Sequence, residues 1–392
     1  MAVSTCDAQP PRVRLGIDVL LSDSLHVIQG KRVGLITNHT GRDADGVSTI
    51  DRLARASGVR LTALYGPEHG LRGIAKPGER VASTVDSATG VPIHSLYGET
   101  RTPTAEMLKD VDVLIFDIQD VGARVYTYPW TMALAAEAAK KTGKTFVVLD
   151  RPDPIRADRV DGGVLDPKFR SFVGAYPVAI RYGLTIGELA RYLVRTKQLD
   201  ANVRVIPMQN YSRSMWWDET GIEWINPSPN MRSIDAAVLY TGTVFFEGTN
   251  VTEGRGTDAP YQLIGAPWLV DAGAIARELN TRNLPGVRFD STTQTPTAGY
   301  KWAGQTIPMI RVTVTDRNAV QPAAVGLHML RAIYVRHRTQ WEWHTAQIDR
   351  LAGSDRLRAA VEREGGIEAL LPVLERESAE FARSTMPDRL YR

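Results

Sequence analysis

Residues 111–150 read VDVLIFDIQDVGARVYTYPWTMALAAEAAKKTGKTFVVLD, and this stretch decides the fold. Val111–Ile118 is a short, nearly all-apolar run of the kind that forms strands buried on both faces, and Thr145–Asp150 repeats it. Between them, Trp130–Thr142 is rich in alanine, ends in two lysines and stops at Gly143, which is typical of a helix C-terminus. Strand, helix and strand in this order predict one unit of a parallel sheet.

The same alternation extends outward through the first half of the chain. Further apolar runs occur at Arg32–Thr37, Leu61–Tyr65, Ile93–Tyr97 and Val203–Met208. Thr102-Pro103 places a capping residue before a proline, which predicts a helix over Thr104–Lys109. Thr185 and Glu188 form a capping box ahead of a helix that continues through Val194. The pattern predicts an α/β fold with a doubly wound parallel sheet.

The character of the sequence changes after about Asn230. Loops become longer and richer in Gly, Thr and Pro, as in Thr241–Pro267. A strand is expected at Pro308–Thr315, a helix from Pro322 to about His337, and further helices toward the C-terminus. Because 392 residues exceed what one core usually holds, we expect a second, smaller α/β domain.

Composition excludes several classes of protein. The net charge is only +3 and the arginines are spread along the chain, so no nucleic acid partner is expected. No apolar run reaches the roughly 18 residues of a membrane span. Cys6 is the single cysteine, which rules out an intrachain disulfide and a cysteine-based metal site. No signal peptide is visible in Met1–Pro11, where Cys6 is either an incidental thiol or the remnant of a lipidation site.

Unusual polar residues follow the predicted strands where these end. Ligands of open α/β sheets bind outside the carboxyl ends of the strands, so these residues predict a pocket. They are Asn38 and His39 after the first strand, Glu68 and His69 after the second, and Asp117, Gln119, Asp120 and Arg124 at the end of the strand at 111–118.

Glu68 is a candidate general acid, because a carboxyl group just past a buried strand is partly desolvated. Gly66 and Gly70 would let its loop adopt an unusual turn, and the alternative is a glutamate that caps the next segment. Asp117 needs a partner inside its apolar run, and Arg124 would supply one, in either a functional or a purely structural pair.

Tyr126, Tyr128 and Trp130 are candidates for stacking on a sugar ring, or else they fill the core. The stiff loop Pro227–Met231 would fix Asn230 in place. Phe246–Thr257 is polar and spaced by glycines, and it contains Glu247, Asn250, Glu253 and Arg255. A loop with two acids, an asparagine and an arginine favours function over a plain surface role.

Several common signatures are absent. No nucleophile elbow, Walker A sequence or dinucleotide fingerprint occurs, so no cofactor is expected. His39 and His69 lack the spacing of a metal motif, so no metal is expected, and a metal-dependent hydrolase using these histidines is an alternative.

Taken together, the motifs resemble the exo-β-N-acetylmuramidase family, long catalogued as a bacterial domain of unknown function. The resemblance runs from about Gly16 to the C-terminus and is carried by these segments: Tyr65–Gly70, Phe116–Arg124, Val148–Pro152, Pro227–Met231 and Glu247–Thr257.

This resemblance implies a Rossmann-like domain at 12–238, a smaller α/β domain at 239–392, and a cleft between them. It implies release of N-acetylmuramic acid from the non-reducing ends of peptidoglycan fragments, in cell-wall recycling outside the cytoplasm. The expected location is periplasmic or extracellular, with the cytoplasm as the alternative. Glu68 matches the family's catalytic glutamate, and Glu247 and Glu253 match its second acidic motif without a fixed role.

The predicted substrate-binding residues are Asn38, His69, Asp117, Gln119, Arg124, Tyr126, Asn230, Asn250 and Arg255. Arg124 or Arg255 is expected to bind the lactyl carboxylate that distinguishes muramic acid from glucosamine. A non-catalytic protein that binds muropeptides or sugars in the same cleft is the second alternative.

Overall fold

The computed structural model describes residues 12–71, 84–98 and 100–392; Cys6 and the rest of Met1–Pro11 lie outside the described residues. A seven-stranded sheet with the order β3-β4-β2-β1-β5-β6-β9 dominates the first half of the chain. Adjacent strands from β4 to β9 are parallel, and β3 pairs antiparallel at the edge. The strands are β1 (Arg32–Thr37), β2 (Arg60–Gly66), β3 (Thr84–Val85), β4 (Pro92–Ser95), β5 (Val113–Asp117), β6 (Thr145–Leu149) and β9 (Val203–Ile206).

Both faces of this sheet are covered, because successive side chains of a strand point to opposite faces. Leu35 packs in the cluster that includes α1 (Gly16–Asp23) and α2 (Thr49–Arg55). Its neighbour Ile36 packs in the other cluster, with α3 (Tyr128–Lys141) and α4 (Ile186–Arg195). The predicted doubly wound sheet is confirmed, and its order is that of a dinucleotide-binding fold, although the chain lacks the glycine fingerprint of one.

Of two helices predicted from capping signals, one is present and the other is not. The capping box is present, with the Glu188 amide donating to Thr185 Oγ1 at 3.2 Å and the Thr185 amide donating to Glu188 Oε2 at 3.1 Å. The predicted helix Thr104–Lys109 is wrong, because this segment forms consecutive turns. These turns bury Leu108 and Val111 and lead into the next strand, which begins at Val113.

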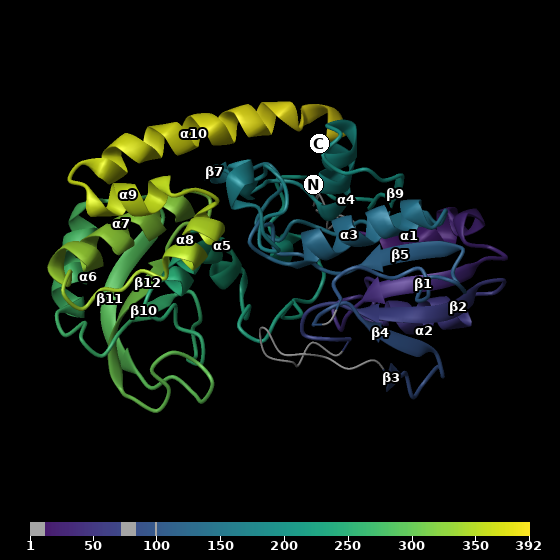
Figure 1. Cartoon of the computed structure of the whole chain (residues 1–392), viewed down its shortest axis with the longest axis horizontal. Coiled ribbons are helices and arrows are strands. Elements are labelled where there is room, and N and C mark those ends of the chain that lie inside the picture. Colours follow the sequence, from purple (N-terminus) through teal and green to yellow (C-terminus); the bar gives the residue numbers. More distant parts are fainter. Residues whose placement is uncertain (1–11, 72–83, 99) are drawn as a thin grey trace, which may run out of the picture.

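The second half of the chain builds a separate body at the other end of the molecule (Figure 1). Its sheet is three-stranded and antiparallel, in the order β10-β12-β11. The strand predicted at Pro308–Thr315 and the helix predicted from Pro322 are confirmed as β12 and α7. The elements are α5 (Ile234–Thr243), β10 (Leu263–Gly265), α6 (Ala272–Thr281), β11 (Val287–Gln294), β12 (Ile307–Val314), α7 (Pro322–Arg336), α8 (Thr345–Ala352) and α9 (Arg356–Glu362).

The long helix α10 (Gly366–Ser384) joins the two bodies (Figure 1). It packs on the two-stranded ribbon of β7 (Asp161–Val164) and β8 (Ala179–Arg181). Beyond it the chain returns to the large sheet, where the Tyr391 hydroxyl donates to Asp150 at 2.6 Å.

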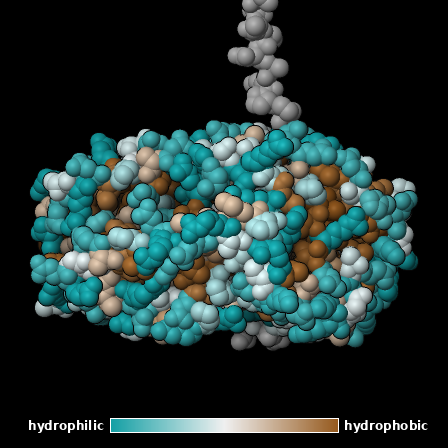
Figure 2. All heavy atoms as spheres, turned by 90° about the horizontal axis from the view of Figure 1, so that it is seen from above, coloured by the Kyte–Doolittle hydropathy of each residue, from teal (hydrophilic) through white to brown (hydrophobic). Residues whose placement is uncertain are grey.

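The surface seen from the α10 side is mostly hydrophilic, with hydrophobic atoms gathered in recesses (Figure 2). Within the described ranges, no helix has the length and apolar character needed to cross a membrane.

Candidate active site

A pocket of about 370 Å³ is lined by both halves of the chain. From the first half come loops that follow β2, β4 and β5, at the carboxyl ends of the strands where the sequence predicted a pocket. Its volume lies near the lower end of the range for small-molecule sites. The lining includes Glu68, His69, Tyr97, Arg101, Tyr126, Tyr128, Phe172, Asn230, Tyr240, Glu247, Arg255, Tyr261 and Arg350.

Glu68 lies in a strained loop directly after β2. His69 and Gly70 both adopt left-handed backbone conformations, with φ of 69° and 72°, and the Gly70 amide donates to the Pro67 carbonyl at 2.9 Å. A histidine in this region is unfavourable unless its surroundings enforce it, as is common at functional sites. The half-buried Glu68 accepts a hydrogen bond of 2.8 Å from Thr127 Oγ1. The unusual turn is therefore present, with His69 in place of Gly66 as its second left-handed residue.

Glu247 reaches the same pocket from the short 3₁₀ helix Val244–Gly248, which follows α5. Its carboxylate pairs with Arg255, and only 17% of its side chain is exposed. Burial raises the pKa of Glu247 to about 7; Arg255 and Lys301 act against this rise, and the carboxylates of Glu253 and Glu68 add to it. A carboxyl group with a pKa near neutrality is suited to proton transfer at physiological pH.

Glu253 plays a different part, although it belongs to the same sequence motif. Its buried carboxylate lies 3.3 Å from Arg255 Nε and 3.5 Å from Lys301 Nζ. The Arg255 Nε also donates to the Tyr261 hydroxyl at 3.0 Å. Glu253 does not line the pocket. It compensates the charge of Arg255, and Arg255 in turn holds Glu247.

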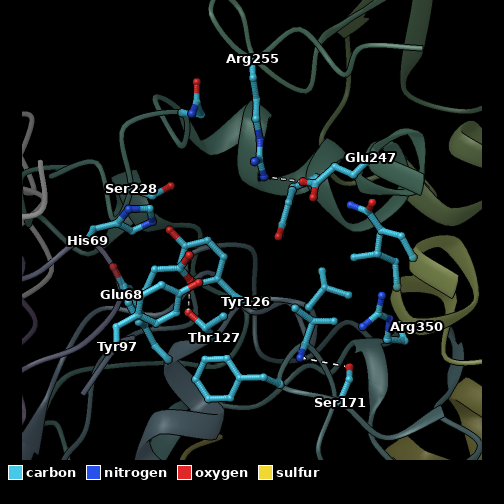
Figure 3. Close-up of a pocket in the computed structure, with 18 of the residues that line it drawn as sticks. Glu68, His69, Tyr97, Tyr126, Thr127, Ser171, Ser228, Glu247, Arg255 and Arg350 are labelled. Atoms are coloured by element: carbon cyan, nitrogen blue, oxygen red, sulfur yellow. Dashed lines mark hydrogen bonds and ion pairs between the residues drawn. The ribbon is translucent and has the colours of Figure 1, made fainter. Parts of the chain in front are cut away.

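Tyrosines form much of the remaining wall (Figure 3). The Tyr126 ring packs edge-on against Tyr128, with centroids 5.0 Å apart, and against Tyr240 at 6.0 Å. Tyr240 packs in the same way on Tyr261 at 4.7 Å. Trp130, by contrast, is fully buried in the core and does not line the pocket.

Four of the predicted substrate-binding residues line the pocket: His69, Tyr126, Asn230 and Arg255. The side chain of Asn230 is oriented by a hydrogen bond, which its Nδ2 donates to the Tyr300 hydroxyl at 3.2 Å. The remaining predicted residues lie outside the lining and have contacts of their own.

Asp117 and Arg124 are both fully buried, and the expected pairing between them is wrong. Asp117 instead accepts two hydrogen bonds from Arg151, at 2.6 and 3.0 Å, because Arg151 follows the neighbouring strand β6. Arg124 donates to the carbonyls of Val178 and Leu351, at 3.3 and 2.6 Å. Burial lowers the pKa of Arg124 to about 9. Neither side chain reaches the pocket.

Asn38, Gln119 and Asn250 support neighbouring segments. Asn38 Nδ2 donates to the hydroxyl of Tyr128, itself a pocket residue, at 3.0 Å. Gln119 Nε2 donates to two backbone carbonyls at 2.8 Å each. Asn250 Nδ2 donates to the Gln340 carbonyl at 2.7 Å, which ties its loop to the segment before α8.

Sequence reasoning missed four residues of the lining, Tyr97, Arg101, Phe172 and Arg350. Tyr97 and Arg101 follow β4, so the strand-end rule would have found them had it been applied to that strand. Phe172 and Arg350 carry no comparable local signal.

No three or more His, Cys, Asp or Glu side chains of the described residues are grouped to hold a metal ion. His39 lies with its Nε2 at 2.8 Å from the Asn226 carbonyl oxygen.

Two carboxyl groups that enter an aromatic-lined pocket from opposite walls are the means by which glycoside hydrolases cleave sugar bonds, and this protein is of that class. The chain belongs to the exo-β-N-acetylmuramidase family. The family description "Exo-beta-N-acetylmuramidase NamZ, N-terminal" matches residues 33–235, and its C-terminal counterpart matches residues 238–391.

Individual relatives agree with this assignment. The peptidoglycan beta-N-acetylmuramidase NamZ of Bacillus subtilis (strain 168) is 41% identical over 385 residues, covering 98% of this chain and 92% of that protein. A crystal structure of a DUF1343 family protein from Bacteroides fragilis covers 97% of this chain and 99% of its own, with 35% identity and a TM-score of 0.90. A second such protein from that organism has 29% identity, the same coverage and a TM-score of 0.77.

Proposed function

We propose that this pocket releases N-acetylmuramic acid from the non-reducing ends of peptidoglycan-derived sugar chains, with Glu68 and Glu247 as the two catalytic carboxyl groups. The observation that carries the proposal is that these two glutamates face one pocket from opposite walls (Figure 3), whereas Glu253 and Asp117 do not line it. The substrate class follows from the family and from the Bacillus subtilis relative, whose name gives the same activity on peptidoglycan.

Glu68 is proposed as the general acid that protonates the leaving oxygen of the glycosidic bond. Thr127 Oγ1 donates to Glu68 Oε2, which orients the carboxyl group of Glu68 in the pocket. The surroundings that keep His69 in its left-handed conformation also fix the loop that carries Glu68.

Glu247 is proposed as the second carboxyl group, acting at the anomeric carbon from the other wall. Its raised pKa makes it a stronger base than an ordinary glutamate, and the pairing with Arg255 keeps the ionised form accessible. It either activates a water molecule or attacks directly. The configuration of the first-formed sugar, followed by NMR, separates these two routes, because only the first inverts the anomeric centre.

The decisive experiment is the hydrolysis of a chromogenic β-N-acetylmuramide by the wild type and by Glu68→Gln and Glu247→Gln. Each variant is expected to lose turnover by about 10²- to 10⁴-fold, the range for a general acid or base. Glu106→Gln is the matched control, since this glutamate is exposed and pairs with Lys109 at the surface. Its turnover should equal that of the wild type.

Two results would overturn the proposal. Binding of the sugar without turnover by the wild type would favour the non-catalytic alternative. Turnover that is abolished by a chelator and restored by a metal ion would favour the metal-dependent alternative. Glu68→Gln is the more informative variant, because it retains the size and the Thr127 contact of the side chain.

We also propose that the enzyme works in the periplasm or outside the cell, where intact peptidoglycan is found. The alternative is action on imported fragments in the cytoplasm. Fractionation of cells that express the full-length protein, with an antibody against the chain, distinguishes the two.

A further inference from the structure

Charge is distributed unevenly around the pocket. Arg255 is neutralised by Glu247 and Glu253, as described above. Arg101 and Arg350 also line the pocket, and within the described residues neither lies within ion-pairing distance of a carboxylate. A substrate that brings a carboxylate into this pocket therefore meets two cations that form no ion pair with the described part of the chain.

Arg101 is held in place by stacking. Its guanidinium carbon lies 4.2 Å from the centroid of the Phe172 ring and 5.8 Å from that of Tyr97, and both rings line the pocket. Stacking covers the face of a guanidinium and leaves the N–H groups at its edge available. The edge has the geometry to bind a carboxylate through two parallel hydrogen bonds.

Arg350 comes from a distant part of the sequence, on α8. Its Nε donates to the Ala346 carbonyl one turn earlier at 2.7 Å, which fixes the stem of the side chain along its own helix. Within the described residues the terminal nitrogens have no hydrogen-bond partner in the protein, and Figure 3 shows the guanidinium at the pocket wall.

We propose that Arg101, supported by Arg350, binds the lactyl carboxylate of N-acetylmuramic acid and so selects muramic acid over glucosamine. This rests on the proposed function, because it names the group of that substrate which the site recognises. It replaces Arg124 and Arg255 in that role: the first is buried against backbone carbonyls and the second is already paired. Without a lactyl group, Arg101 and Arg350 would gain no ion pair in the complex, which gives the selectivity a physical cause.

The test measures binding separately from turnover. Calorimetric titration with free N-acetylmuramic acid, with its lactyl methyl ester and with N-acetylglucosamine should show the acid binding most tightly to the wild type. In Arg101→Gln, affinity for the acid should fall about 10- to 100-fold, as expected for a charge-assisted hydrogen-bonded pair, with the ester little changed. Arg350→Gln should have the same pattern with a smaller effect.

Two further variants serve as controls. Arg60→Gln removes an exposed arginine at the opposite end of β2 and should leave all three affinities unchanged. Phe172→Ala keeps both arginines but removes the stacking partner, so it should weaken binding of the acid more than of the ester. Thermal unfolding establishes that each variant is folded.

The outcomes are distinct. Equal losses for acid and ester in Arg101→Gln, or no preference for the acid in the wild type, would overturn the assignment of Arg101. A wild type that prefers the acid, loses this preference with Arg101→Gln and yet fails to hydrolyse the chromogenic muramide would support the assignment and refute the proposed function.

Discussion

Thr127 donates a hydrogen bond of 2.8 Å to Glu68, and this contact joins the loop after β2 to the start of α3. The Thr127 hydroxyl group orients the carboxyl group of the proposed acid, and Thr127 also lines the pocket. Thr127→Val preserves the shape of the side chain and removes the donor.

We expect Thr127→Val to lower kcat about tenfold, since a hydrogen bond to a charged group contributes about 1.5–3 kcal/mol. Thr127→Ser keeps the hydroxyl and should retain most of the activity. Steady-state kinetics on the chromogenic muramide measure both. Equal activity of the valine and serine variants would show that the hydrogen bond does not position Glu68 for catalysis.

The neighbours of Glu247 predict opposite pH shifts for two variants. If Glu247 acts as a base, kcat/KM falls as the pH drops through its pKa of about 7, because the protonated form cannot accept a proton. Arg255 lowers this pKa, so Arg255→Gln should move the acidic limb to higher pH. Glu253 raises it, so Glu253→Gln should move the limb to lower pH.

The pH dependence of kcat/KM from about pH 4 to 9 tests this pair, since it reports groups of the free enzyme. Arg255→Lys keeps the charge and should shift the limb less than Arg255→Gln. Shifts of the same sign in Arg255→Gln and Glu253→Gln would mean that the acidic limb does not belong to Glu247.

The sequence predicted the centre of the large sheet well because the strands β1, β5 and β6 are buried on both faces. A run such as Thr145–Leu149 must then be almost wholly apolar, and that composition is visible without any knowledge of its neighbours. The helix predicted at Thr104–Lys109 is absent because capping signals indicate how a helix begins and not whether it continues beyond one turn.

The site was predicted where function follows from position along a strand, and missed where it depends on packing. Glu68 comes directly after a strand, so its placement at the sheet edge was predictable. Glu247 and Glu253 look equivalent in the sequence, and only the fold separates the one in the pocket from the one behind Arg255. Arg350 reaches the pocket from α8, and nothing near it in the sequence indicates this.

Breaking the ion pair between Asp117 and Arg151 should destabilise the fold without changing the preference for the muramide over the glucosaminide. Asp117 is fully buried and Arg151 nearly so, and the pair lies outside the pocket. Asp117→Asn leaves the buried guanidinium without its counter-charge, which should cost about 3–5 kcal/mol in the free energy of unfolding.

Chemical denaturation measures this loss, and kinetics below the unfolding transition measure the preference for the muramide over the glucosaminide. The preference should match that of the wild type. A changed preference at unchanged stability would return Asp117 to the role of substrate ligand that its motif first indicated.

A substitution at Gly248 tests whether the position of Glu247 depends on the packing of its 3₁₀ helix against α8. The glycine ends the 3₁₀ helix that carries Glu247, and a Cβ added there would lie 2.5 Å from Cβ of Ile348 on α8. Gly248→Ala should therefore destabilise the fold by about 1–3 kcal/mol and displace Glu247, lowering kcat as well. The added methyl group would meet Cβ, Cα and N of Ile348, all of which an alanine keeps, so Ile348→Ala cannot relieve the clash and the double variant should recover none of kcat. Recovery of kcat in the double variant would show that contact with the backbone and Cβ of residue 348 is not what requires a glycine at this position.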